Sequence, residues 1–515
     1  MKNKILFLLI FTLQLNAQFH NTLPTDHWVY ESISRLQIAG HFRSLQQGAR
    51  PYTRQEIAKA LLEIESNPHN KTLQIEINRL KQEFQIEISA LQKESDFINR
   101  LKKTEVAQLL KSYIKPDETD KIKDKQKIKS KIELGTNLVM DDTYQEDLEK
   151  NNTLRIYTFL NFGDHLAVKY GVLGNDQLGD DKLYIGDKWR GIVGYQEQMY
   201  ALYSNQIFNL KFGRDYVKWG YGKKGNLLIS DNSRSFDMLS LKTKNDRLNF
   251  HSIVAKLDNM NGARRYLSAV RFEFNPFENL YLGASQAGLF GGENQELDFA
   301  LANPFSFSYF TIHNDPEKSN NAMVYFDAAY YLQKRYKIYG ELLIDDYQAD
   351  SGTKGTLEPN EIGFTLGTEF LPPKFISHGW LEFTQVRNRT YNTQAAVYEK
   401  FIHRNQSIGY PQTDLQRLNL HLDKWINSRL NLIFEQDLYR KGEGTILGEF
   451  TTPYMEDDVT VEEGYTEKIP YGTVETTLRT RLGAKYYFNN SINVEGYLGY
   501  ESIDNLNNNA GHADS

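Results

Sequence analysis

Between residues 132 and 502, apolar and polar residues alternate one by one along many short segments. One such segment places Ile362 and Leu366 on one side of the backbone, with Glu361 and Glu369 on the other. Successive side chains of a β-strand point to opposite faces, so this period of two predicts strands with one apolar and one polar face. The pattern does not identify the solvent on either face, because a soluble antiparallel sheet alternates in the same way.

Two features of these segments favour a membrane. Most are about ten residues long, which is the length that a tilted strand needs to cross hydrocarbon. Their connections alternate between tight turns, such as 163–164 and 489–490, and long loops, such as 290–321 and 441–472. Short turns on one side and long loops on the other are typical of outer-membrane barrels. A soluble sandwich or propeller is the alternative.

Aromatic residues near the segment ends add to this picture. They are Tyr336, Tyr339, Trp380, Trp425 and the run from Tyr486 to Phe488. Outer-membrane barrels carry girdles of aromatic side chains where their strands cross the two interfaces. We therefore expect these residues to lie in such girdles.

The fold that this pattern predicts is mainly β: a transmembrane antiparallel β-barrel of about 16–18 strands, preceded by a helical periplasmic domain. Bacterial single-chain barrels normally have an even number of strands. The 17 segments that we identify therefore predict either a chain one strand short of 18 or a count that is off by one. The predicted strands are 132–140, 153–162, 165–174, 197–205, 206–216, 237–244, 247–257, 265–275, 279–289, 323–333, 335–346, 360–371, 378–389, 414–424, 428–439, 473–488 and 491–502.

The residues before the barrel have the period of helices. A first helix is expected to end at Gly40, and Thr53 and Glu56 have the spacing of a capping box at the start of a second helix. Residues 71–114 predict a long, charged helix. The predicted order is a signal peptide (1–17), a helical periplasmic domain (18–114), a lysine-rich linker (115–131), the outer-membrane barrel (132–502) and a polar tail (503–515).

Composition narrows the choice of class. Tyrosine (32) and phenylalanine (29) are abundant, and a mean hydropathy of -0.57 is too polar for a bundle of membrane helices. The chain has no cysteine, which excludes disulfides and thiolate metal sites. A net charge of -6 gives no support to nucleic-acid binding.

We find no motif that would make the chain an enzyme. Adjacent acids such as Asp345 and Asp346 point to opposite faces of a regular strand, so they cannot share one site. The histidines form no zinc motif, and the chain has no nucleophile elbow and no phosphate loop. We predict no catalytic residues, no metal and no cofactor, with an outer-membrane hydrolase as the alternative.

Part of the helical region resembles half of an S-layer homology repeat. The resemblance is carried by the pattern HWVYESISRLQIAG followed by RPYTRQEIAKAL. It implies contact with cell-wall polymers, so the expected partners of these helices are peptidoglycan or periplasmic assembly proteins. A plain helical hairpin is the alternative.

A second resemblance covers most of the chain after residue 131. The stretch GRDYVKWGYGKKGNLLISDNSRSFDMLSL, the later Asn303-Pro304-Phe305 and the strand end ELLIDD resemble, in this order and spacing, the Wzi family of capsule assembly proteins. The resemblance implies an outer-membrane, lectin-like barrel of 18 strands. It also implies that the partners are outer-membrane lipid and a capsular or other surface polysaccharide, which the barrel would hold at the cell surface.

The same resemblance directs attention to the residues around Trp219. Polysaccharide sites use flat aromatic rings against sugar faces, and charged or amide groups against hydroxyl and carboxylate groups. The alternative is that Trp219 belongs to an interfacial girdle and that Arg214 pairs with Glu341 or Asp345 in the lumen. The candidate binding residues are Arg214, Tyr216, Lys218, Trp219, Tyr221, Asn226, Asp231, Asn232, Arg234 and Asp345.

A second function fits the same barrel. If the lumen were open, charged side chains inside it would select small polar solutes, and the protein would be a passive outer-membrane porin. The sequence does not show whether loops fill the lumen, and this difference separates the two functions.

Overall fold

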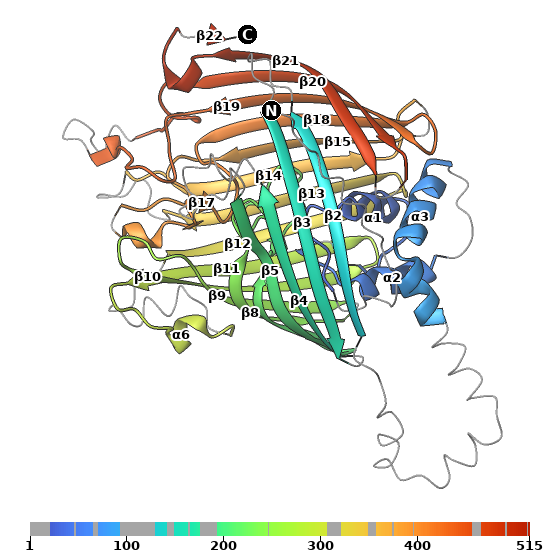
Figure 1. Cartoon of the computed structure of the whole chain (residues 1–515). Coiled ribbons are helices and arrows are strands. Elements are labelled where there is room, and N and C mark those ends of the chain that lie inside the picture. The colour runs from blue at the N-terminus through green and yellow to red at the C-terminus, as the bar shows by residue number, and fades with distance from the viewer. Residues whose placement is uncertain are drawn as a thin grey trace, which may run out of the picture.

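The computed structural model describes residues 21–45, 48–64, 71–92, 129–141, 149–162, 165–175, 193–245, 247–305, 321–348, 357–372, 375–394, 396–455, 465–489, 492–511 and 513–514. The predicted signal peptide and most of the predicted linker lie outside these residues. A curved sheet forms the body of the molecule, and the helices lie at one end of it (Figure 1).

The described elements before the sheet are α1 (Val29–Ile38), β1 (Ala49–Arg50), α2 (Arg54–Leu62) and α3 (Lys71–Glu83). The sheet contains β2 (Lys129–Asp141), β3 (Glu149–Phe162), β4 (Leu166–Asn175), β5 (Val193–Ser204), β6 (Phe208–Asp215), β8 (Phe236–Thr243), β9 (Leu248–Lys256), β10 (Arg264–Phe277), β11 (Leu280–Gly292), β12 (Asn321–Leu332), β13 (Tyr336–Asp346), β14 (Glu361–Phe370), β15 (His378–Val386), β18 (Leu415–Trp425), β19 (Leu430–Lys441), β20 (Glu475–Tyr487), β21 (Asn493–Asp504) and β22 (Ala513–Asp514). The connections contain β7 (Lys218–Trp219), α6 (Phe299–Ala302), η3 (Val397–Glu399), β16 (Ile402–His403), β17 (Gln406–Ser407), η4 (Pro453–Met455) and η5 (Leu506–Asn508).

Each long strand of the sheet pairs antiparallel with the next one in the chain, from β2 to β21. The 17 predicted segments each overlap one of these strands, so the predicted barrel strands are confirmed. Because each step reverses the direction, β2 and β21 point the same way. They lie next to each other, and the described residues show no ladder between them. The two-residue β22 pairs with β21.

The faces of the strands are inverted relative to a soluble sheet. In β14, Glu369 and Thr365 are fully buried, whereas Leu366 is 59% exposed. The large apolar side chains exposed on the other long strands include Phe212 (71%) and Leu498 (82%). An outer apolar surface of this kind is the lipid-facing surface of a membrane barrel.

Replacing Leu366 with arginine is expected to destabilise the barrel in lipid by about 2–4 kcal/mol, because Leu366 lies mid-strand, where a charge meets hydrocarbon. The same change at Phe370, the last residue of β14, should cost about 0–1 kcal/mol because the strand end lies near an interface. Urea unfolding from lipid vesicles measures both. Equal costs at the two positions would contradict a lipid-facing surface.

The girdle prediction holds only in part. Tyr336 and Tyr486 are exposed at strand ends, as expected. Tyr339, Trp380 and Trp425 are at most 8% exposed and belong to the inward set of their strands. The sequence alone does not show whether an aromatic residue at a strand end points inward or outward, because the strand register determines which face it lies on.

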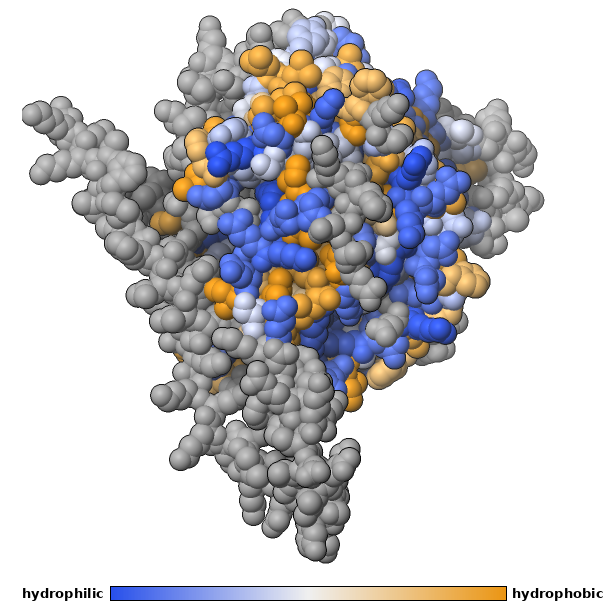
Figure 2. Space-filling model, turned by 90° about the vertical axis from the view of Figure 1, so that its right-hand side faces the viewer, coloured by the Kyte–Doolittle hydropathy of each residue, from blue (hydrophilic) through white to orange (hydrophobic). Residues whose placement is uncertain are grey.

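The helical domain closes the barrel at the end where the short turns lie. The Arg43 guanidinium donates to the backbone oxygen of Glu278 in the β10–β11 turn (3.2 Å), and the Tyr281 hydroxyl donates to the Arg43 oxygen (2.8 Å). Figure 2 shows this end of the molecule, where blue, hydrophilic residues are interspersed with orange, hydrophobic ones. Short turns mark the periplasmic side of such barrels. The helical domain therefore lies at the end that the sequence predicts to face the periplasm.

A buried ionic network joins the helical domain to the barrel wall. Arg35 of α1 donates to Glu76 of α3 (2.5 Å) and to Asp423 of β18 (3.0 Å). Although burial opposes its charge, Asp423 and Glu76 raise the pKa of Arg35 above its usual range. The Ser34 hydroxyl donates to Glu369 of β14 (2.8 Å). The network fixes the helices to the inner wall.

The local helix signals have mixed outcomes. The Thr53–Glu56 capping box is present, and α1 ends before Gly40, which has a φ of 96°. Helical structure continues from α3 over residues 85–92, and the rest of the predicted long helix lies outside the described residues. No helix in the described part of the chain is both long and apolar enough to cross a membrane.

Candidate functional site

Residues 216–235, between β6 and β8, turn back into the barrel; we call them the plug loop. Within it, β7 pairs with β1 of the helical domain, placing Trp219 opposite Ala49. Trp219 is fully buried, and its indole nitrogen donates to Nδ1 of His251 on β9 (3.0 Å). The plug loop therefore runs from the long-loop end of the barrel to the periplasmic domain.

Glu341 of β13 is the main attachment point of the plug loop. Its carboxylate accepts from the backbone nitrogens of Tyr221 (2.7 Å), Gly222 (2.6 Å) and Leu227 (3.1 Å), and from Nδ2 of Asn226 (2.8 Å). The Glu341 side chain is 3% exposed. One buried carboxylate thus satisfies four donors of a loop that has no strand partner on this side.

Glu382 of β15 is a second attachment point. It accepts from the backbone nitrogens of Lys223 (2.8 Å) and Lys224 (3.2 Å), and from the Tyr339 hydroxyl (2.8 Å). The Lys223 ammonium lies 2.9 Å from Glu369. The tip of the plug loop is therefore held by acids on three neighbouring strands of the wall.

An apolar cluster fills the lumen above these acids. It combines Trp219, Leu227 and Ile229 of the plug loop with inward side chains of β8 to β13, such as Leu267 and Met323. The alternating pattern predicts polar inward faces for the strands, whereas apolar side chains fill this part of the lumen. The reason is that the plug loop brings its own apolar side chains, and the inward residues facing them are apolar as well.

A second loop, residues 387–414, covers the cluster from the long-loop end. The buried Arg265 of β10 donates to the backbone oxygens of Tyr398 (2.6 Å), Lys400 (2.6 Å) and Ile402 (2.9 Å) in this loop. The Ser230 nitrogen donates to the Ile408 oxygen (2.8 Å). The two loops therefore pack as one unit across the lumen.

The structure places nine of the ten candidate binding residues in or beside the plug loop and Asp345 at the end of β13. Trp219, Tyr221 and Asn226 are buried, so they support the loop and offer no face to a sugar. Burial raises the pKa of Tyr221 well above its usual range. Trp219 is in the lumen rather than in an interfacial girdle, so the girdle alternative for it is wrong.

The other candidates are partly exposed and mostly paired. Arg214 pairs with Asp237 of β8 (2.5 Å), not with Glu341 or Asp345 as the lumen alternative expected. Lys218 pairs with Asp231 (2.9 Å); burial opposes ionisation, yet the ammonium lowers the pKa of Asp231. Sugar binding by this group stays a prediction.

The remaining four candidates also have nearby partners. Nδ2 of Asn232 donates to the Ser407 oxygen (3.1 Å), and the Arg234 guanidinium lies 5.1 Å from the centre of the Tyr195 ring. The nitrogen of Tyr216 is 2.9 Å from Asp215 Oδ1. Asp345 accepts from the Tyr391 nitrogen (2.6 Å), which makes it a support of the second loop.

A polar cleft that sequence reasoning missed lies between the plug loop and the wall at β15 to β20. We call it the basic cleft, and its volume is about 40 Å³. In the sequence, the only sign of this cleft is that charged residues occupy every second position of several strands. The sequence does not show which strands lie side by side, so it could not predict that these residues meet. It is lined by Lys224, Trp380, Arg417, Asn419, Leu420, Glu435, Gln436, Asp437, Arg479 and Arg481.

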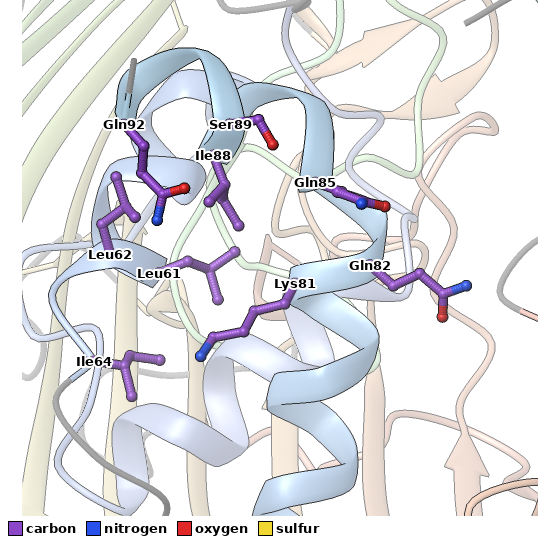
Figure 3. A pocket seen from close by; sticks show the side chains of 9 residues that line it. All are labelled: Leu61, Leu62, Ile64, Lys81, Gln82, Gln85, Ile88, Ser89 and Gln92. Carbon is purple, nitrogen blue, oxygen red and sulfur yellow. The ribbon is translucent and has the colours of Figure 1, made fainter. Parts of the chain in front are cut away.

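A larger groove lies in the helical domain. Figure 3 shows Leu61, Ile64 and Ile88 pointing into this groove, between α2 and residues 81–92. Its volume is about 520 Å³. Glutamine and lysine side chains surround the apolar centre, and the groove lies at the periplasmic end, far from the long loops. Within the described ranges, no three or more acidic or histidine side chains gather in a way that could hold a metal ion.

Comparison with solved structures finds Wzi of Escherichia coli, described as an outer membrane protein involved in group 1 capsule assembly and a carbohydrate-binding β-barrel. The identity is 15% and the TM-score is 0.59, over 94% of this chain and 96% of that chain. The outer membrane protein OprD of Pseudomonas aeruginosa aligns at 9% identity over 75% of this chain and 88% of that chain, with a TM-score of 0.37. OccK8 of the same organism aligns at 8% identity over 73% and 94%, with a TM-score of 0.40.

No curated protein matches the sequence. A family model does match: residues 194–515 fit that of the capsule assembly protein Wzi. The match covers more than half of the chain, from β5 to its end, and includes the plug loop, the second loop and the basic cleft. The chain therefore belongs to the capsule assembly protein Wzi family.

Proposed function

We propose that this protein binds a surface polysaccharide at the outer membrane and supports the assembly or retention of a capsule. Family membership and the lipid-facing barrel support this location and role. The similar E. coli protein is itself described as carbohydrate-binding. In this proposal the barrel anchors the protein, and the loop end together with the polar lumen provides the binding surface.

The observation that carries the proposal is the filled lumen. The plug loop and the second loop pack a dry cluster against the wall, and the helical domain covers the periplasmic end. A passive porin needs a continuous water-filled path, whereas a binding protein needs fixed side chains. Rigidly held loops therefore favour binding over diffusion.

Glycan binding by the detergent-solubilised protein tests this function. We expect the protein to retain one class of polysaccharide on a glycan array, and Arg214→Ala to weaken that binding, because Arg214 is a partly exposed candidate at the loop end. Arg247→Ala, at the short-turn end, is the matched control and should bind as the unchanged protein does. If no glycan is retained, the proposal is wrong. If the Arg214→Ala variant binds glycan normally, the predicted role of Arg214 is wrong and the proposed function stands.

We propose that binding occurs without turnover, since the acids that face the lumen are engaged in holding loops. We also propose that the helical domain contacts peptidoglycan or periplasmic assembly proteins. Its outward polar face and the groove of Figure 3 are the surfaces available for such a contact.

A further inference from the structure

The pairing register of four neighbouring strands brings the residues of the basic cleft together. Trp380, His421, Glu435 and Arg481 lie directly opposite one another on β15, β18, β19 and β20. The neighbouring inward row contains Asn419, Asp437 and Arg479 on β18, β19 and β20. Facing residues on adjacent strands lie about 4.5–5.5 Å apart. The two rows therefore form one continuous polar surface on the inner wall.

Most charges of this surface are already paired. Arg417 makes a forked contact with Asp437, through Nη2 (2.6 Å) and Nε (3.1 Å). Glu435 accepts from Nδ1 of His421 (3.1 Å) and lies 3.8 Å from the Lys224 ammonium. Arg479 pairs with Glu501 of β21. Both acids of the cleft therefore have basic partners.

Arg481 is different. No carboxylate of the described residues lies within 4.0 Å of its guanidinium, although the side chain faces the cleft and is only half-exposed. The cleft is lined by four basic and two acidic side chains, so its charge is positive. A guanidinium that is partly removed from water favours an anionic partner, and a carboxylate fits its forked geometry.

The size of the cleft limits what can enter it. A volume of about 40 Å³ is far below the roughly 300–1,000 Å³ of pockets that enclose a whole ligand. It holds on the order of three water molecules. A charged substituent fits this space, and a complete sugar ring does not.

We propose that the basic cleft receives the carboxylate of an acidic sugar residue, with Arg481 as its main contact and Lys224 beside it. The inference rests on the proposed function and names its substrate class: a polysaccharide containing uronic acids. The plug loop contributes Lys224, and the wall contributes Arg481. The acidic group therefore meets two elements that only the folded barrel brings together.

The test is calorimetric titration of the full-length, detergent-solubilised protein with tetragalacturonate, a hyaluronan tetrasaccharide, neutral galactotetraose and inorganic phosphate. We expect at least one acidic tetrasaccharide to bind about tenfold or more tightly than the neutral one. Arg481→Gln should remove that preference, and Arg481→Lys should retain part of it. Arg440→Gln is the matched control, since Arg440 lies on β19, bonds to Gln416 (2.7 Å) and does not line the cleft.

Several results would overturn the proposal. These are equal binding of acidic and neutral tetrasaccharides, or an Arg481→Gln variant that melts normally and binds the acidic probe as before. Phosphate binding as tight as that of the acidic sugars would mean a plain anion site. Retention of a neutral glycan alone would overturn the acidic subsite but leave the proposed function standing, whereas retention of no glycan would overturn both.

Discussion

Arg35→Met is expected to destabilise the folded protein by about 3–5 kcal/mol, the cost of leaving buried charges without their partner. Arg35 lies between Glu76, which is fully buried, and Asp423, which is 2% exposed. Methionine keeps much of the volume but removes the charge that both carboxylates need. Urea unfolding followed by tryptophan fluorescence measures the effect, because the Trp425 indole donates to Glu76 (3.1 Å) at the same interface.

A control at the same interface separates charge burial from general disturbance. Arg43→Met removes an exposed contact with a turn oxygen and a ring contact with Tyr331 (4.2 Å), so it should cost about 1 kcal/mol or less. Adding Glu76→Gln to Arg35→Met should recover part of the loss, because one unpaired charge disappears. An Arg35→Met variant as stable as Arg43→Met would show that the network does not hold the helical domain in place.

Glu341→Ala is expected to release the plug loop and open the lumen. The change leaves four buried donors without their acceptor, and each such donor costs about 1–3 kcal/mol. The loop then loses its main contact with the wall, while the strands keep their ladders. In planar bilayers we expect steady ion conductance from the variant and none of comparable size from the unchanged protein.

The matched control is Asp346→Ala, an exposed acid at the end of the same strand. This variant should give no steady ion conductance in the bilayer. A large, steady conductance from the unchanged protein would contradict the filled lumen and favour the porin alternative. If the Glu341→Ala variant gave no steady conductance, the apolar cluster alone would hold the plug loop.

Much of the barrel was predictable because its signals are local. A ten-residue strand between lipid and lumen must alternate, and a short turn needs few residues, so both can be read without knowing the partner strands. The capping box of α2 was predictable for the same reason, since Thr53 and Glu56 are three residues apart. Side chains at strand ends, such as Trp380, were assigned less well because the register was unknown.

The candidate site was less predictable. Trp219 stands in a stretch rich in tyrosine, lysine and asparagine, which indicates an exposed binding loop. The structure buries it completely, because Glu341, more than 100 residues away, accepts the donors of that loop. The basic cleft joins Lys224 to Arg481 over a still longer separation. No spacing rule connects such residues.

The sequence by itself determined the class of this protein: strands with one lipid-facing side, a helical domain before them and the motifs of its family. These properties depend on residues that are one to ten positions apart in the chain. The lipid or water that each face of a strand contacts determines which residue types occur there. Only the tertiary structure decided that the lumen is filled and which charges meet inside it. A loop inside a barrel is held by inward side chains of many strands, and those side chains converge only after the sheet has curled.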